Sequence, residues 1–405
     1  MVVSIETTLE LWALTLRDVK RRMRGLFAQE RAAVNAGLFL DGLLGDERRK
    51  TGWMRAEVAG DPGPWRQQAL LGRDRWDADE LRDMVLDYVI EHLADQDAVL
   101  VIDETGFLKQ GQASCGVARQ YTGSAGKITN CQIGVLASYV SRHGHAFVDR
   151  ALYLPKAWAD NPARLQATNV PDEIGFSTKP QLATKMIERA IAAHVPFAWV
   201  AADTVYGVGN IETALRRAGK GYVLGVSSTH GFGSWNRERP LGGSAEEIAK
   251  ALPASDWQRL PAGAGTKGPR LHDWCYLELA NLEAEEFNDE KHGLWTRGLL
   301  IRRNIADGDL AYFTTWCPAG TSIVIAPRDD LSSRQVITAC ARWFGRRSRP
   351  ISIRLLHSSE TTGSMYKELL PHAAAYACTA AIRLGMERRS KPTSIRFRAN
   401  QPARL

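Results

Sequence analysis

The sequence predicts an α/β protein with a mixed sheet, a helical N-terminal region and a mainly β insertion. Three observations predict this fold. Helical spacing dominates residues 1–95, short apolar runs alternate with helical segments over residues 96–227, and a stretch rich in Gly, Pro and Trp follows at 228–293. A chain of 405 residues exceeds one typical domain, so we expect two or three units.

Residues 1–95 are predicted to form a helical N-terminal domain. Its clearest helix spans residues 78–93, where Leu81, Val85 and Val89 fall on one face. Closer to the N-terminus, residues 17–24 form a basic run. Because clustered cations attract phosphate groups, this domain is a candidate for DNA binding, although a helical cap without DNA contacts would show the same pattern.

Residues 96–227 show the pattern of an α/β core. Apolar, β-branched runs predict buried strands, and the turn Arg142–His145 between two of them predicts a hairpin. In chain order we expect strands at 98–102, 128–140 and 146–154, a helix at 179–194, a strand at 197–202, a helix at 211–218 and a strand at 222–226. Three antiparallel strands followed by alternating helix and strand are the order of a ribonuclease-H-like fold, which we therefore predict.

Residues 228–323 are predicted to be a mainly β insertion with returning strands. The part at 228–293 predicts weak structure of its own, whereas 294–305 and 311–316 look like a strand pair. Residues 324–405 form the last segment. Beyond Glu387 this segment is basic, has no acid and has few apolar residues, so we expect it to be partly disordered.

The composition favours a polyanionic partner and argues against several classes of enzyme. The net charge is +7 and the isoelectric point is about 9.1, and phosphate contacts made by Lys and Arg release counterions. Six cysteines form no Cys-x-x-Cys pair, and neither a Gly-x-Ser-x-Gly nor a His-Glu-x-x-His motif occurs. No signal peptide or membrane span is visible in the sequence, so we expect a cytoplasmic protein.

Two predicted strands of the core are each followed by an aspartate. Asp103 comes directly after 98–102, and Asp203 directly after 197–202. The carboxyl edge of parallel strands is where α/β folds place their sites. Two converging carboxylates bind hard divalent cations, and a pair of such ions supports phosphodiester cleavage. A lone Asp at a strand end is often a turn former or helix cap, but two on matching strands shift the balance toward a metal site.

The residues around both aspartates resemble bacterial DDE-type insertion-sequence transposases of the IS701 kind. The resemblance covers roughly residues 10–323 and is specific over 98–227. It is carried by the segments 98–111, 116–135, 152–155, 175–180 and 202–207. The resemblance implies a ribonuclease-H-like catalytic domain, a mainly β insertion before the last acid, and strand cleavage and transfer that depend on Mg²⁺ (or Mn²⁺). It also implies that Asp103 and Asp203 are the first two acids of the Asp-Asp-Glu triad.

The resemblance further implies double-stranded DNA, at element ends and target, as the partner, and we expect a homodimer on DNA because two ends must be cut. Several side chains near the acids suit contacts with DNA, and each one singly would also fit a solvated surface. These predicted DNA-binding residues are Lys109, Arg119, Tyr121, Lys127, Lys179 and Tyr206.

The third acid of the triad is missing from its expected place. The family pattern places an Arg-Trp pair shortly before a helical Ile-Glu, whereas this chain has no acid in the stretch Arg342–Arg347 that contains its Arg-Trp pair. Two explanations are open. Either Glu360 or Glu368 supplies the acid from a diverged helix, with Glu360 as our assignment, or a reading-frame change has replaced the C-terminus.

Two other functions compete with an active transposase. The first is a catalytically impaired DNA-binding remnant, which shares every feature except the third acid. The second is a phosphatase of the haloacid-dehalogenase type, whose first motif is also a strand followed by Asp. That family usually has a second Asp where this chain has Thr105, and its crossover topology disagrees with the predicted hairpin.

Overall fold

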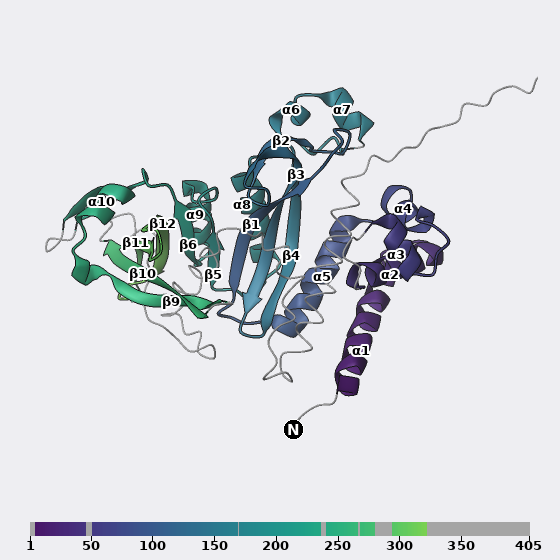
Figure 1. Ribbon diagram of the computed structural model, residues 1–405, viewed down its shortest axis with the longest axis horizontal. Helices are drawn as coiled ribbons and strands as arrows, with labels where there is room; N and C mark the ends of the chain where they lie inside the picture. Colours follow the sequence, from purple (N-terminus) through teal and green to yellow (C-terminus); the bar gives the residue numbers. More distant parts are fainter. Residues whose placement is uncertain are drawn as a thin grey trace, which may run out of the picture.

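The computed structural model describes residues 5–45, 51–168, 170–235, 240–265, 268–279 and 294–321. Within these residues, a helical N-terminal region leads into one large mixed sheet, and the insertion extends that sheet at the end away from the helices (Figure 1). The helices of the N-terminal region are α1 (Ile5–Arg24), α2 (Glu30–Leu44), α3 (Gly52–Val58), α4 (Trp65–Gly72) and α5 (Ala78–Leu93).

The core and the insertion follow along the chain. The core contains β1 (Val99–Leu108), β2 (Ala118–Thr122), β3 (Lys127–Ser141), β4 (Gly144–Tyr153), α6 (Lys156–Ala159), α7 (Pro162–Ala167), α8 (Lys179–Ala192), β5 (Trp199–Ala202), α9 (Gly209–Arg217) and β6 (Gly221–Val226). The insertion contains β7 (Gly231–Ser234), β8 (Leu241–Ser244), α10 (Ala245–Ala251), a 3₁₀ turn (Ala254–Asp256), β9 (Gln258–Gly265), β10 (Gly268–Leu279), β11 (Trp295–Asn304) and β12 (Leu310–Pro318).

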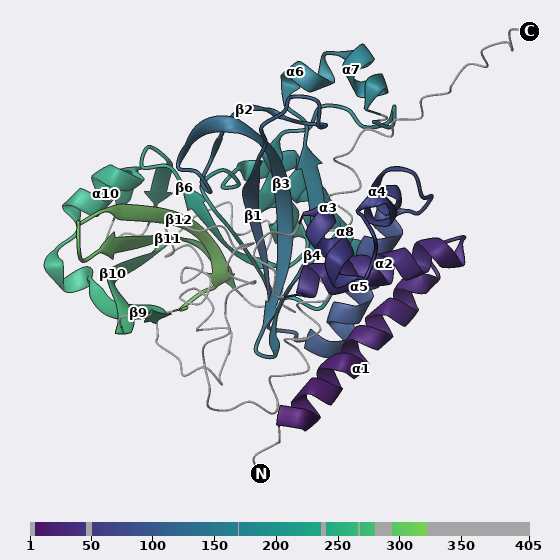
Figure 2. The same ribbon diagram turned by 45° about the vertical axis from the view of Figure 1, so that its right-hand side comes forward.

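Helix α5 confirms the helix predicted at 78–93 and joins the helical region to the sheet. Asp77 caps it by accepting a hydrogen bond from the amide of Asp79 at 2.6 Å, which satisfies one donor of the first turn. Its apolar face packs on β4, and Val85 and Tyr88 are buried in the same core as Phe147 of that strand. The helices therefore bury their apolar stripe against the sheet, and Figure 2 shows them gathered on one side of it.

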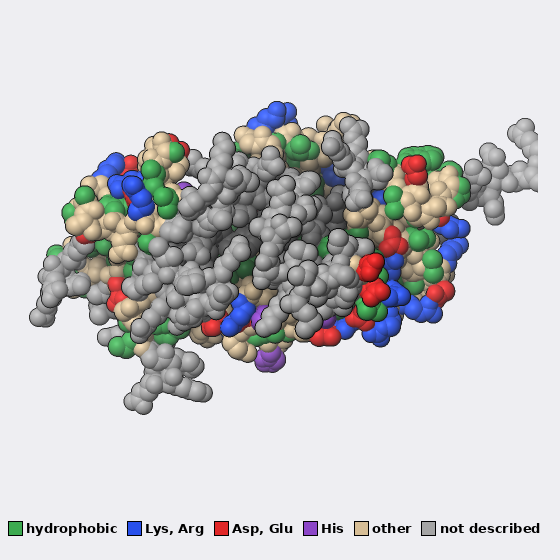
Figure 3. Space-filling view, turned by 60° about the horizontal axis from the view of Figure 1, so that its bottom comes forward, with side chains coloured by type: hydrophobic (Ala, Val, Ile, Leu, Met, Phe, Trp, Pro, Cys, Tyr) green, Lys and Arg blue, Asp and Glu red, His purple; other side chains and the backbone are tan. Residues whose placement is uncertain are grey.

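The basic run in α1 is largely paired with acids. Lys20 Nζ lies 2.6 Å from Asp41, Arg22 bridges to Glu91 at 2.7 Å, and Arg24 pairs with Glu30. In the space-filling view of Figure 3, Lys and Arg side chains are interspersed with Asp and Glu at the helical end of the molecule. The run is thus not a continuous cationic stripe, and it supports DNA binding by this region less than the sequence indicates. No helix in the described part of the chain has the length and apolar character needed to cross a bilayer.

The strands of the core run in the order β4-β3-β1-β5-β6. Strands β1, β3 and β4 are paired antiparallel, whereas β1, β5 and β6 are paired parallel. The predicted hairpin is formed by β3 and β4, and the helices predicted at 179–194 and 211–218 are α8 and α9. The core sheet is therefore of the mixed α/β kind that the sequence predicts, with β1 at its centre.

Strand β1 is longer than predicted, so the expectation that Asp103 follows the end of a strand is wrong. Beyond Asp103, β1 continues to Leu108, which pairs with Cys131 of β3. Its parallel neighbour β5 ends at Ala202. The apolar run 98–102 stops at Ile102 because β1 needs apolar residues only where it is covered on both faces. Asp103 is thus the first residue of β1 beyond the end of β5.

For the described residues 228–235, 240–265 and 268–279, the prediction of weak structure is also wrong. Strand β12 pairs antiparallel with β6, and β11, β10 and β9 add to it in turn, giving a ten-stranded sheet in the described part of the chain. Helix α10 packs Ile248 into a separate core with Phe232 and Leu299. Strands β11 and β12 confirm the strand pair predicted at 294–305 and 311–316. Strands β9 and β10 were not predicted, because they form by pairing with each other and with β11.

The sheet separates two apolar cores, and the two faces of β1 belong to different ones. Leu100 and Ile102 lie in the core that faces α5 and α8. Val99 and Val101 lie in the other core, with Trp199 and residues of β10 to β12. Side chains alternate along a strand, so Asp103 shares the face of Val101. This assigns Asp103 to the face that the insertion strands continue.

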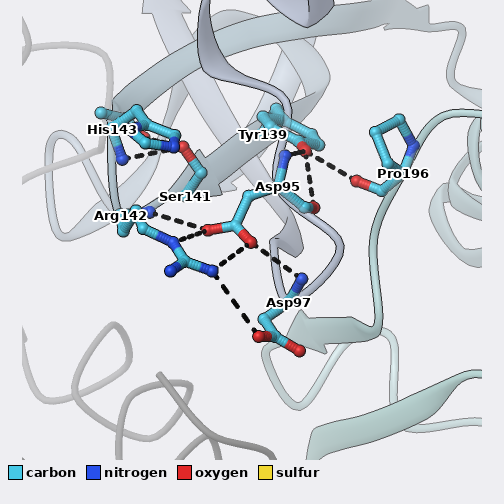
Figure 4. A network of polar contacts seen from close by, with 8 residues as sticks. Asp95, Asp97, Tyr139, Ser141, Arg142, His143 and Pro196 are labelled. Atoms are coloured by element: carbon cyan, nitrogen blue, oxygen red, sulfur yellow. Dashed lines mark hydrogen bonds and ion pairs between the residues drawn. The ribbon is translucent and has the colours of Figure 1, made fainter. Parts of the chain in front are cut away.

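At the end of the sheet away from Asp103, a polar network ties the start of β1 to the β3–β4 turn (Figure 4). Arg142 donates to both carboxylate oxygens of Asp95, at 2.8 and 2.9 Å. The hydroxyl oxygen of Tyr139 lies 3.0 Å from the carbonyl oxygen of Asp95 and 2.6 Å from that of Pro196, and it accepts from the Asp95 amide. The hydrogen bonds from Arg142 lower the pKa of Asp95 to about 2.

We expect Asp95→Asn to lower the free energy of unfolding at pH 7 by about 1–2 kcal/mol, since the paired carboxylate is lost. The folded pKa lies below the unfolded value of about 3.9. The contribution of Asp95 is therefore present above about pH 4 and is lost as the pH falls toward 2.

Urea unfolding of the wild type and Asp95→Asn at pH 7 and pH 3 measures this effect. The matched control is Asp97→Asn, because Asp97 is more exposed and lies 3.7 Å from Arg142. A difference for Asp95→Asn that stays constant between the two pH values would contradict the pairing.

Candidate active site

The two predicted acids lie side by side where the parallel pairing of β1 with β5 ends. Ile102 of β1 and Ala202 of β5 are paired in register, and each is followed directly by an aspartate. Paired residues of neighbouring strands lie roughly 4.8 Å apart, so the backbones of Asp103 and Asp203 begin within that spacing. The structure therefore brings the first two predicted acids together on one sheet edge.

Both carboxyl groups hold their protons more tightly than usual. Burial raises the pKa of Asp103 to about 7, and the charge of Asp203 adds to this, while a hydrogen bond from the amide of Glu104 opposes it. Burial likewise raises the pKa of Asp203 to about 6, against a hydrogen bond from the amide of Val205 at 3.0 Å. Two partly desolvated carboxylates this close favour a cation between them.

A second polar group lies behind the acids, on the helix side of the sheet. Glu104 accepts hydrogen bonds from Lys179 Nζ, at the start of α8, and from the hydroxyl of Tyr206 at 3.1 Å. Tyr206 is fully buried. Glu104 thus connects β1, α8 and the turn after Asp203. The sequence motif contains Glu104, but nothing in the sequence shows that it pairs with residues 75 and 102 positions away.

The turn after Asp203 packs closely on the backbone of β6. A Cβ atom on Gly225 would lie 2.7 Å from the Thr204 nitrogen and 2.9 Å from the Asp203 carbonyl carbon. On the other side of the contact, a Cβ on Gly207 would lie 1.9 Å from the Gly225 oxygen. Both positions require glycine because backbone approaches backbone there. This contact fixes where the chain turns and hence where Asp203 stands.

The predicted DNA-binding residues fall into two groups. Arg119, Tyr121 and Lys127 are exposed on the β2–β3 hairpin, where Tyr121 pairs with Ile128 and both have exposed side chains. Lys109 follows β1 near the same hairpin, where its amide donates to Asn130. DNA contact by these four residues stays a prediction, and their place on the surface is compatible with it.

Lys179 and Tyr206 lie elsewhere. Tyr206 is buried and bonded to Glu104, so a direct DNA contact by its side chain disagrees with its placement. The side chain of Lys179 is one-fifth exposed and is ion-paired with Glu104. Both residues bind Glu104, the neighbour of Asp103 on β1. A DNA contact by Lys179 stays a prediction.

A cavity of about 410 Å³ opens beside Asp203. Its walls come from the end of β6 and from the insertion strands β10, β11 and β12, including Arg302. Sequence reasoning missed Arg302. The alternation of Leu300 with Arg302 in a predicted strand was the available signal, but the neighbours of that strand in the sheet were unknown.

The side chains present fit a divalent cation in kind but supply only part of a site. Carboxylate oxygens suit Mg²⁺ or Mn²⁺, and burial raises the pKa of both aspartates, which a bound cation would counter. In the described ranges, no group of three or more His, Cys, Asp or Glu side chains is placed to hold a metal. Glu360 and Glu368 lie outside the described residues, as does the whole segment 324–405.

Comparison with known families decides which class of protein this is. The family described as "DDE superfamily endonuclease" matches residues 22–240, more than half of the chain. The chain belongs to this family. The match includes both aspartates and the whole of the core sheet up to β6. The haloacid-dehalogenase alternative is therefore wrong, in keeping with the antiparallel β1–β3 pairing.

Individual relatives of this DDE endonuclease add detail. A protein of Microchaete diplosiphon, described as "Probable transposase for insertion sequence element IS701", is 31% identical over 195 residues. The match covers 47% of this chain and 47% of that protein, so the chain matches about half of the relative's length. Among solved structures, the NurA nuclease from Sulfolobus solfataricus aligns with a TM-score of 0.27 and 9% identity, over 67% of this chain and 83% of that chain. At that score the likeness carries no conclusion about fold or activity.

We expect Gly225→Ala to destabilise the protein by about 1–3 kcal/mol and to reduce DNA cleavage, because the new methyl group displaces the turn after Asp203. Gly209→Ala is the matched control, since a Cβ there meets nothing within 4 Å at the start of α9. Thermal unfolding and cleavage of labelled DNA measure both effects. Equal behaviour of the two variants would show that the close approach does not position Asp203.

We expect Asp103→Asn to stabilise the metal-free protein at pH 8 by roughly 1–3 kcal/mol. The folded pKa of Asp103 lies above the unfolded value of about 3.9. Ionisation is therefore disfavoured in the fold, and the wild type loses stability as the pH rises from about 4 to about 7. The advantage of the variant should grow over this window and stay constant above it.

Thermal unfolding in EDTA from pH 4 to 8, repeated with Mg²⁺, measures this dependence. Mg²⁺ should raise the unfolding temperature of the wild type and leave that of Asp103→Asn nearly unchanged. Equal Mg²⁺ responses of both proteins would place the cation elsewhere.

Proposed function

We propose that this chain is an insertion-sequence transposase that cleaves and transfers DNA strands with divalent ions held by Asp103 and Asp203. The observation that carries the proposal is the in-register pairing of Ile102 with Ala202, which places two desolvated carboxylates side by side. Membership of an endonuclease family supports the reaction class, and the partial match to a transposase relative supports the biological role.

We also propose that the core is ribonuclease-H-like. The strand order β4-β3-β1-β5-β6, with three antiparallel strands followed by two parallel ones, supports this assignment. In this arrangement the acid on the central strand and the acid after its parallel neighbour share one edge. The insertion would then lie before the third acid, in agreement with the resemblance in the sequence.

We assign a separate role to each group of residues around the reacting phosphate. Asp103 and Asp203 would hold Mg²⁺ or Mn²⁺, which when bound activates the attacking water or hydroxyl and stabilises the leaving oxygen. Glu104 holds the strand of Asp103 against Lys179 and Tyr206. Arg119, Tyr121 and Lys127 present an exposed cationic and aromatic surface to double-stranded DNA. Homodimer formation on DNA remains part of this proposal.

The third acid separates two versions of this function. Glu360 is our proposed third ligand. If Glu360 completes the metal site, the chain cleaves DNA. A catalytically impaired DNA-binding remnant is the second candidate, favoured by the two-acid cluster in the described residues and by the missing Ile-Glu after Trp343. The impaired version binds DNA and nicks it poorly with Mg²⁺, because a shared metal site lacks one ligand.

The deciding experiment incubates the chain with labelled element-end DNA and Mg²⁺ or Mn²⁺, alongside Asp103→Ala, Asp203→Ala and Glu360→Gln. Loss of either aspartate should reduce cleavage by at least about 100-fold while DNA binding is kept, since even an outer partner of a metal site contributes 10- to 100-fold.

Loss at Glu360→Gln as well would identify the third acid. Weak cleavage by the wild type that none of the variants changes would indicate the DNA-binding remnant. Robust cleavage that survives both aspartate substitutions would exclude the proposed chemistry.

A further inference from the structure

The cavity beside Asp203 lies on the same sheet face as the two acids. Along the sheet, Gly225 pairs with Phe313, which pairs with Leu300, and Arg302 is two residues further along β11. Because alternate residues of a strand share a face, Arg302 and Asn304 point to the side of Phe313 and Gly225. The pairing of Arg302 with Trp274 and of Asn304 with His272 extends this face onto β10. The two acids and these insertion residues therefore lie on the same face of the sheet.

The charges around the cavity are unevenly placed. Asp203 stands on the core side, and Arg302, His272 and Asp309 stand on the insertion side. Of the described residues that line the cavity, Arg302 is the only Lys or Arg. Its guanidinium carbon lies 6.0 Å from the centre of the Trp274 ring, a cation–π contact that orients the guanidinium. Asn304 and the serines Ser227 and Ser228 add neutral hydrogen-bonding groups.

We infer that Arg302 forms a phosphate-binding subsite for the DNA strand that passes Asp203. The inference rests on the proposed DNA cleavage function and adds a contact to it. A guanidinium keeps its positive charge and donates hydrogen bonds to phosphate oxygens. Because Asp203 and Asp309 both repel a phosphate, a strand can enter this cavity only where a cation offsets them, and Arg302 stands at that position.

The geometry limits which phosphate is bound. Three strand spacings of about 4.8 Å separate β5 from β11 across β6 and β12, so Arg302 begins roughly 14 Å from Asp203. One DNA strand advances about 3.4 Å along the axis for each nucleotide. The phosphate at Arg302 is therefore within about four nucleotides of the one at the acids. Arg302 would position the strand and take no part in bond breaking.

The neighbouring residue on the same strand provides a matched control. Arg303 points to the opposite face of β11, where it pairs with Asp273 at 3.1 Å and lies over the Trp257 ring at 4.2 Å. Arg303→Gln and Arg302→Gln remove the same charge from adjacent positions. Only the second removes it from the cavity.

The test measures binding of the full chain to a fluorescent duplex of arbitrary sequence in EDTA, over salt concentrations of about 50 to 200 mM. Arg302→Gln should weaken binding about tenfold at low salt and reduce the salt slope by about 0.9. Arg302→Lys should keep the wild-type slope, because the charge remains. Arg303→Gln should stay within about twofold of the wild type.

Each outcome bears on a different claim. Equal slopes for Arg302→Gln and Arg303→Gln would overturn the subsite and leave the cleavage function standing. A wild-type chain that does not bind the duplex would overturn the DNA function itself. If Arg302→Gln does not fold, as judged by its thermal unfolding, ultraviolet cross-linking of the wild type to the duplex replaces it. Cross-linked peptides from β10 to β12 support the subsite, and their absence from these strands overturns it.

Discussion

The parallel pairing of β1 with β5 is the constraint on which the site depends. Neither aspartate has a functional environment alone, because each is only a carboxyl group after a buried strand residue. Pairing Ile102 with Ala202 brings them within one strand spacing and removes part of their water. The close contact of Gly225 with the turn after Asp203 then fixes the second acid. Everything proposed about metal ions and DNA requires this pairing first.

The same sheet joins the edge that carries the two acids to the insertion. Strand β12 continues the core sheet through its antiparallel pairing with β6, so the face that carries Val101 and Asp103 runs on to Phe313 and Arg302. The opposite face is covered by α5 and α8 and holds Glu104 with its partners. The two acids therefore lie on one face of the sheet, and Glu104 with its partners lies on the other. This division follows from strand alternation and from where the helices pack.

Much of the fold could be predicted from the sequence, because local periodicity determines it. The spacing of Leu81, Val85 and Val89 predicted α5, and the turn Arg142–His145 predicted the β3–β4 hairpin. The full length of β1 could not be predicted, since it depends on continued pairing with β3. Strands β9 and β10 were missed for the same reason, because they form by pairing with each other and with β11.

The site was predictable in part. Asp103 and Asp203 were found because acids after apolar runs are a local signal. The sequence did not reveal Arg302 as part of the cavity, nor the hydrogen bond between Tyr206 and Glu104. In both cases the residues that meet are far apart in the sequence. The basic run in α1 suggested a strongly positive surface on the N-terminal helices. In the fold, Asp41 and Glu91 from other helices neutralise part of this charge. Contacts between residues far apart in the sequence are therefore what limited the prediction in each case.

Locating the bound cation tests the central claim most directly. Crystals of the chain grown with Mn²⁺ would reveal the ion by its anomalous scattering. The account predicts a Mn²⁺ peak bonded to oxygens of both Asp103 and Asp203, at about 2.1 Å. A well-occupied ion elsewhere, with both aspartates unbound, would contradict it.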